Sequence, residues 1–216
     1  GVRATYPISL VVALALTLAS GLARADDPAP PAAPVPGAAA WEVARAAYWA
    51  GDPSSGALLS ELAASPTAPA AMRRDALHLL GRLLLGEAPR GGLAPAAPPE
   101  GLPRAVAAWR QALDLTTEAP SHLTDLIRFG LARALIANGS RDDEPLTLLA
   151  AIDKSPYSPV RADAAFLGAR HLELLGRVDE ARKAYRGILD RWPEALFARD
   201  VKVRLGDWDK ALFDQA

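Results

Sequence analysis

The sequence predicts an all-α protein in which helix-turn-helix units stack in chain order to form a solenoid. Apolar residues recur at helical spacing through most of residues 41–213. Half of the 216 residues are hydrophobic, with Ala and Leu the most abundant, and this composition suits closely packed helices. Gly and Pro residues interrupt the helical pattern at short intervals. Because one helix pair can bury its apolar face only against a neighbouring pair, we expect a stack of such pairs.

The first 25 residues have the three parts of an export signal. Arg3 supplies a positive charge, residues 8–19 form an uncharged apolar run, and Ala23–Ala25 places small residues where a signal peptidase reads them. We therefore expect residues 1–25 to be a signal peptide cleaved before Asp26, and the protein to be periplasmic or otherwise exported. The alternative is an uncleaved membrane anchor, although the apolar run is shorter than the roughly 20 residues that span a bilayer.

A linker and two helix pairs are expected next. Residues 26–40 carry five prolines, which prevent a regular helix and favour an extended linker. The folded domain, residues 41–213, is expected to begin with two helix pairs. The expected helices of these pairs are residues 41–50, 56–64, 70–85 and 102–115. Residues 87–101 are rich in Gly and Pro, so they are expected to form an inserted loop within the second pair.

Two further helix pairs and a C-terminal segment complete the expected domain. Asn138-Gly139 and Gly176 are positioned to end the first helix of each pair, and Pro193 follows the last complete pair. The expected helices are residues 122–137, 146–153, 161–175, 178–191 and 194–205, with a short last helix that begins at Gly206.

A repeat of about 36 residues underlies these pairs. Pro120, Pro156 and Pro193 recur at intervals of 36 and 37 residues. Ala181 lies five residues after the turn glycine of its unit, and Tyr185 lies four residues after Ala181. These features resemble the tetratricopeptide repeat family, with the best agreement at residues 162–193.

The resemblance to tetratricopeptide repeats implies a right-handed α-solenoid of about four repeats with a short C-terminal remainder. It implies that Ala181 lets two helices approach closely, that Tyr185 fills the gap beside it, and that Pro193 ends the second helix. The third unit departs from the family pattern, since Glu144 and Leu148 stand where Ala and an aromatic residue are usual.

Several function classes lack support in the sequence. The absence of Cys excludes disulfides, thiolate metal sites and Cys nucleophiles, and a net charge of −1 provides no broad basic field for nucleic acid. No phosphate-binding loop or clustered acid–base pair is present, and no histidine has a second histidine four residues later. We therefore expect no enzymatic activity, no cofactor, no metal site and no small-molecule substrate. The three histidines are His78, His122 and His171.

A recurrent Arg with an aromatic or His residue four positions earlier is the main candidate for a binding site. In the tetratricopeptide repeat family, these late positions of the first helices face the concave groove, so the resemblance implies a column that binds a peptide carboxylate or an acidic segment. The alternative is that each Arg packs on a neighbour and pairs with a nearby acid. The candidate residues are His78, Arg82, Phe129, Arg133, Phe166 and Arg170.

The export signal and the repeat together predict an exported interaction scaffold. The resemblance is to exported bacterial proteins, so we expect a protein or peptide partner in the assembly or maintenance of a cell-envelope complex. The alternative is a membrane-tethered accessory factor of a secretion or chaperone system. In that alternative residues 8–19 remain as the anchor, and the protein contacts the membrane only through this segment.

Overall fold

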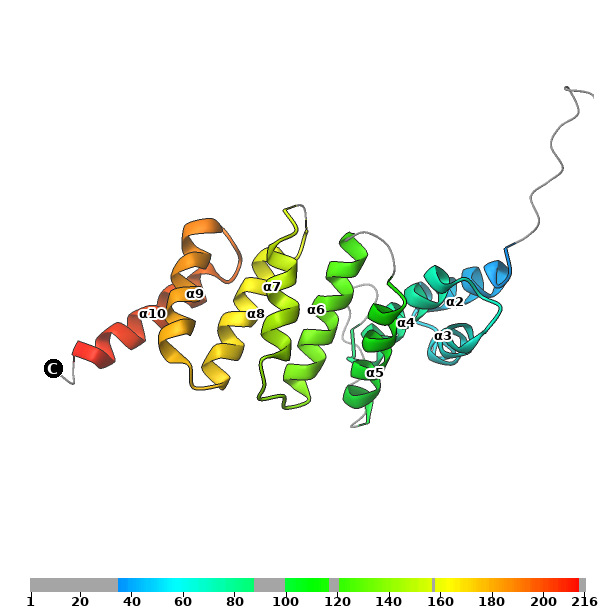
Figure 1. The fold of residues 1–216 in the computed structure, drawn as a ribbon, viewed down its shortest axis with the longest axis horizontal. Helices are drawn as coiled ribbons and strands as arrows, with labels where there is room; N and C mark the ends of the chain where they lie inside the picture. The colour runs from blue at the N-terminus through cyan, green and yellow to red at the C-terminus, as the bar shows by residue number, and fades with distance from the viewer. Residues whose placement is uncertain (1–34, 88–99, 117–120, 157, 214–216) are drawn as a thin grey trace, which may run out of the picture. The chain divides into compact units, whose positions relative to one another are not determined.

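The computed structural model describes residues 35–87, 100–116, 121–156 and 158–213, with side chains to residue 209. These residues contain nine α-helices and no strand (Figure 1), so the expected all-α class is confirmed for this part of the chain. The expected signal peptide, most of the expected linker and most of the expected inserted loop lie outside it. The helices are α2 (Ala38–Ala50), α3 (Ser55–Ala64), α4 (Ala70–Leu84), α5 (Gly101–Asp114), α6 (His122–Ala137), α7 (Glu144–Asp153), α8 (Arg161–Leu174), α9 (Val178–Arg191) and α10 (Ala198–Phe213).

Each helix packs against the next one in chain order, from α2 to α10. The colours in Figure 1 follow this order along the row of helices. In addition, α2 contacts α4, α4 contacts α6, and α6 contacts α8. Alternate helices therefore form a second set of contacts beside the sequential one. None of the described helices is both long enough and apolar enough to cross a membrane.

The same turn closes α2, α4, α6 and α8. In each case a glycine has φ between 72° and 87°, a backbone conformation that side-chain-bearing residues rarely adopt. The N–H of this glycine and that of the next residue donate to carbonyls in the last turn of the helix, which satisfies groups that the helix leaves unpaired. The expected turns at Asn138-Gly139 and Gly176 are confirmed. The four turn glycines are Gly51, Gly86, Gly139 and Gly176.

The C-terminal segment differs from the expectation. The two helices expected on either side of Gly206 are one continuous helix, α10, which begins only at Ala198. A glycine within a helix costs about 1 kcal/mol relative to alanine but does not end it unless the backbone turns. Val201, Leu205 and Trp208 all pack on the same core cluster, and this packing continues the helix through Gly206.

The buried apolar residues of the described ranges form three clusters. The largest lies between α2 and α6 and includes Tyr48 and Trp109. A small cluster around Leu149 and Ile152 joins α6, α7 and α8. The third lies between α8 and α10 around Tyr185.

Trp109 fixes the spacing of three helices in the largest cluster. It lies on α5 and is 1% exposed. A Cβ added to Gly81 on α4 would lie 2.6 Å from its ring, and one added to Gly130 on α6 would lie 2.4 Å from it. Both distances are far below a carbon–carbon contact, so glycine at these two positions allows α4 and α6 to close on the indole.

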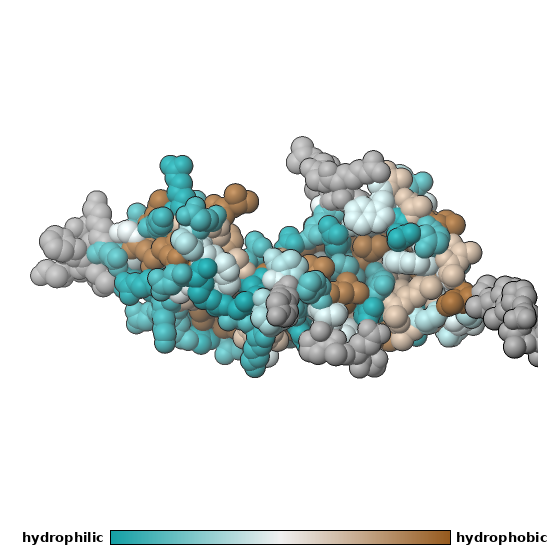
Figure 2. Space-filling model, turned by 90° about the horizontal axis from the view of Figure 1, so that it is seen from above, coloured by the Kyte–Doolittle hydropathy of each residue, from teal (hydrophilic) through white to brown (hydrophobic). Residues whose placement is uncertain are grey.

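Exposed apolar side chains are scattered over the described surface. In Figure 2, hydrophobic residues reach the visible face as separate patches between hydrophilic ones. Singly exposed apolar residues are normal on protein surfaces and do not mark a site. The largest exposed ones are Val35, Val43, Trp49, Leu174, Val178, Leu196 and Val203.

Candidate partner-binding site

The structure divides the six predicted site residues between two pockets. His78, Arg82, Phe129 and Arg133 line one pocket of about 240 Å³ between α4, α5 and α6. Phe166 and Arg170 line a separate pocket of about 350 Å³ with residues of α9 and α10. The six residues therefore do not line one pocket.

The turn glycines also show that Arg82 has a different repeat position from the other two arginines. Arg133 and Arg170 each lie six residues before the turn glycine of their helix, whereas Arg82 lies four residues before Gly86. Two residues correspond to more than half a turn of an α-helix. The equivalence expected from the sequence therefore does not hold for Arg82, although its side chain still reaches the pocket that contains Arg133.

One carboxylate joins Arg82 to Arg133. Nε of Arg82 donates to Oε2 of Glu87 at 2.8 Å, and Nη1 of Arg133 donates to Oε1 of the same side chain. The two guanidinium groups come from α4 and α6, so their meeting depends on the packing of these helices. Hydrogen bonds between two charged groups are among the stronger ones in proteins. We call Arg82, Arg133 and Glu87 the arginine site.

The turn after α4 places Glu87. Gly86, with φ 80°, lets the chain reverse, and the N–H of Glu87 donates to the carbonyl of Arg82 at 2.9 Å. Glu87 is therefore fixed by its backbone beside the last turn of α4. Its side chain is 22% exposed and lies against the two arginines.

Aromatic rings lie beneath both guanidinium groups. Cζ of Arg133 is 5.6 Å from the ring centroid of Phe129, one helical turn earlier on α6. Cζ of Arg82 is 6.0 Å from the ring centroid of Tyr48 on α2. A cation over an aromatic face is attracted by the ring and held in a restricted orientation. Tyr48 is a member of this arrangement that the sequence did not indicate.

His78 is an interior residue of the same pocket. Its Nδ1 accepts a hydrogen bond from Nε1 of Trp109 at 3.3 Å. Burial, followed by the positive charge of Arg82, lowers the pKa of His78 from 6.5 to about 4, and Glu87 opposes the shift. The imidazole is therefore neutral at neutral pH. Arg82, Arg133 and Glu87 then leave one positive charge in excess in the arginine site.

The second pocket has a different character. The Phe166 ring stacks on Phe197, with centroids 4.5 Å apart and an angle of 12° between the rings, and it packs against the core cluster between α8 and α10. Nε of Arg170 lies 3.5 Å from Glu173, and Nε of Arg204 lies 3.1 Å from the same carboxylate. Phe166 thus serves packing, and Arg170 shares an acid with a neighbouring helix.

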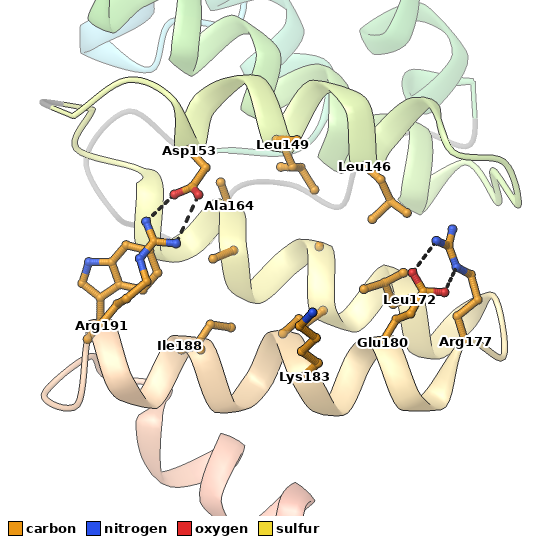
Figure 3. Close-up of a pocket in the computed structure, with 17 residues that line it drawn as sticks. Leu146, Leu149, Asp153, Ala164, Leu172, Arg177, Glu180, Lys183, Ile188 and Arg191 are labelled. Atoms are coloured by element: carbon orange, nitrogen blue, oxygen red, sulfur yellow. Dashed lines mark hydrogen bonds and ion pairs between the residues drawn. The ribbon is translucent and has the colours of Figure 1, made fainter.

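A further groove was not predicted from the sequence. It has a volume of about 580 Å³ and lies over α8, with α7 and α9 at its sides (Figure 3). Small residues such as Ala164 and Gly168 on α8 and Gly187 on α9 leave this space unfilled. Small residues at helical spacing could have indicated this groove in the sequence, but the same pattern is typical of a tightly packed helix interface.

Ion pairs lie at both ends of this groove, one between α7 and α9 and the other between the residues that directly precede these two helices. Nη1 of Arg191 donates to Asp153 at 3.1 Å, and this hydrogen bond is the main cause that lowers the pKa of the Asp153 carboxyl. At the other end Nη1 of Arg177 donates to Asp143 at 2.7 Å, and the same guanidinium binds Glu180. Lys183 lies between the two ends in Figure 3. Most charges around this groove are thus already paired.

Comparison with protein-family models, with curated proteins and with solved structures gave no match. Within the described ranges, no group of three or more His, Asp or Glu side chains is placed to hold a metal ion.

Proposed function

We propose that this protein is an interaction scaffold that binds an acidic segment of a partner protein at the arginine site. The observation that carries the proposal is the convergence of Arg82 and Arg133, from two different helices, on one carboxylate. This geometry is what recognition of an Asp or Glu side chain, or of a chain terminus, requires. The excess positive charge favours an anionic partner.

The same proposal includes a right-handed solenoid of about four repeats with a C-terminal remainder, like that of tetratricopeptide repeat proteins. Two findings support it. The glycine turn recurs after α2, α4, α6 and α8, and these first helices contact one another in sequence. A repeat scaffold of this kind acts by presenting side chains from successive units to a partner. An experimental structure would test the handedness and the repeat count.

The setting that we propose is outside the cytoplasm, in the assembly or maintenance of a bacterial envelope complex. The alternative is a membrane-tethered accessory factor of a secretion or chaperone system, with residues 8–19 as its anchor. Sequencing the N-terminus of the protein isolated from its cells separates the two. A mature chain that begins at Asp26 supports the first and contradicts the second, whereas a retained apolar segment does the reverse.

Binding of the purified protein to a peptide array tests the function. The array pairs peptides rich in Asp and Glu with matched peptides in which these residues are Asn and Gln. We expect retention of the acidic members, and we expect Arg133→Gln to weaken it about tenfold or more, because a hydrogen-bonded charged partner is lost. Arg110→Gln is the control, since Arg110 is an exposed arginine that pairs with Glu144 elsewhere. Equal retention of both peptide sets, or no effect of Arg133→Gln, contradicts the proposal.

A further inference from the structure

We infer that Glu87 is a built-in competitor for the partner's carboxylate. In this protein the Glu87 carboxylate occupies the position between Arg82 and Arg133 that an acidic group of the partner would take. Partner binding exchanges one carboxylate for the other, and Glu87 thereby sets the affinity of the site. This inference rests on the proposed function and adds its regulation.

Among the described residues, the hydrogen bonds to Glu87 use only part of the donor capacity of the two arginines. Each guanidinium donates one hydrogen bond to Glu87, whereas a guanidinium carries five N–H donors. Glu87 reaches two arginines at once, so each of its oxygens serves a different guanidinium. A carboxylate that is not tethered to the α4 turn is free to take the paired, two-bond geometry with one arginine. An incoming acid therefore has a stronger arrangement available than Glu87 has.

The position of Glu87 at the end of α4 is unfavourable for its negative charge. It lies two residues beyond Leu85, the C-cap residue of α4. The carbonyl groups at this end carry partial negative charge, which favours basic residues such as Arg82 and disfavours an acid. The end of α4 thus does not stabilise the negative charge of Glu87, and the contacts with the two arginines are what hold its side chain.

The surroundings leave room for a second carboxylate. The pocket of about 240 Å³ beside the arginine site is lined by Phe129 and Leu126 as well as by the charged groups. Arg133 is 39% exposed, so its guanidinium remains accessible to a partner while Glu87 is bound. The excess positive charge attracts an acid before exchange.

When a group of the same chain occupies the site, a partner can bind only the fraction of molecules in which the site is free. The apparent affinity falls in proportion to that fraction. Removing the charge of Glu87 should therefore tighten binding. If Glu87 had only a structural role, its substitution would weaken binding or leave it unchanged, because the site would become less well ordered. The direction of the change in affinity distinguishes the two roles.

The experiment measures dissociation constants by fluorescence anisotropy for two labelled peptides. One carries Asp and Glu side chains and an amidated C-terminus, and the other has no acidic side chain but a free C-terminal carboxylate. Glu87→Gln should tighten binding of at least one peptide about tenfold, as expected when a mostly occupied competitor is removed. Glu61→Gln makes the same charge change at an exposed position on α3 and should change affinity less than about twofold.

The outcomes separate this inference from the function on which it rests. If Glu87→Gln binds the amidated peptide more tightly, the ligand is a side-chain carboxylate. If it binds only the other peptide more tightly, the ligand is a chain terminus. If Glu87→Gln binds no more tightly than Glu61→Gln while Arg133→Gln still weakens binding, the competitor role is wrong and the function stands. If Arg133→Gln has no effect, or neither peptide binds any variant, both are wrong. Glu87→Ala, which also removes the carboxylate, should reproduce the gain.

Discussion

The indole of Trp109 donates its Nε1 hydrogen to Nδ1 of His78, 3.3 Å away, within the largest core cluster. This bond joins α5 to α4 and requires an unprotonated Nδ1. Arg82 and Glu87 are the charged groups that affect the pKa of the imidazole, and burial exceeds both as a cause of its lowered pKa. Protonation of His78 would place a second positive charge beside Arg82.

The first prediction is a loss of stability in mild acid. Because the pKa of His78 is 6.5 when unfolded and about 4 when folded, the unfolded chain binds the proton more readily between these values. The free energy of unfolding should be highest above pH 6.5 and should fall as the pH declines towards 4, by up to about 3 kcal/mol from this group. Urea unfolding at about pH 7.5 and about pH 4.5 measures the difference.

His78→Asn provides the control for this pH dependence. The amide oxygen can accept the Trp109 hydrogen bond but does not titrate, so most of the difference between the two pH values should disappear in this variant. An unchanged pH dependence would assign the acid sensitivity to other groups.

The second prediction concerns Gly130. A methyl group at this position would lie 2.4 Å from the rigid Trp109 ring, so Gly130→Ala should destabilise the protein by about 2–3 kcal/mol. In Gly187→Ala, on α9, the added methyl has nothing within 4 Å. It should stabilise the protein by up to about 1 kcal/mol through helix propensity alone. Thermal unfolding of both variants measures the contrast, and similar effects of the two would contradict the role of Trp109 as a spacer.

The third prediction compares two alanines on α9. Ala181 is 0% exposed and lies in the core cluster between α8 and α10, so Ala181→Leu should cost about 1–3 kcal/mol of stability. Ala184 lines the groove of about 580 Å³, which has room for a larger side chain. Ala184→Leu should therefore change the free energy of unfolding by less than about 1 kcal/mol. A larger loss for Ala184→Leu would mean that the groove closes in solution.

The fourth prediction tests whether the three arginines act together. Arg170 lies in a separate pocket and shares Glu173 with Arg204. Arg170→Gln should therefore leave the affinity for acidic peptides within about twofold of the original value, whereas Arg133→Gln reduces it. Anisotropy titrations of the two variants give the comparison. Equal losses of affinity in the two variants would support the single binding column of three arginines that the sequence indicated.

The expected helices agree with the observed ones where the boundary signals are local. α6 and α9 begin and end at the expected residues, because capping, glycine turns and proline act within a few residues. Ser121, for example, accepts a hydrogen bond from the N–H of Thr124 at the start of α6. Gly206 carried no such turn, since a lone glycine ends a helix only when the backbone reverses there.

The candidate site was predictable only in part. Repeat positions indicated the arginines of α4 and α6, but Arg82 lies four residues before its turn glycine, whereas Arg133 lies six residues before its own. Glu87 belongs to a segment that reads as a loop, and Tyr48 is contributed by α2, so their meeting with Arg82 depends on packing between helices. The groove over α8 exists because small side chains leave space unfilled. Hydrophobic periodicity in the sequence does not distinguish such a groove from a filled core.

The division of the buried residues into three clusters has a consequence for local unfolding. Helices packed mainly on their neighbours can open in parts, at a cost set by the contacts of that part alone. Opening of α10 and α9 breaks the cluster around Tyr185 and leaves the cluster around Trp109 intact. Backbone amide hydrogens of α9 and α10 should therefore exchange with solvent faster than those of α4–α6. Recognition of an acid at Arg82 and Arg133 would then persist in molecules whose C-terminal helices are momentarily unfolded.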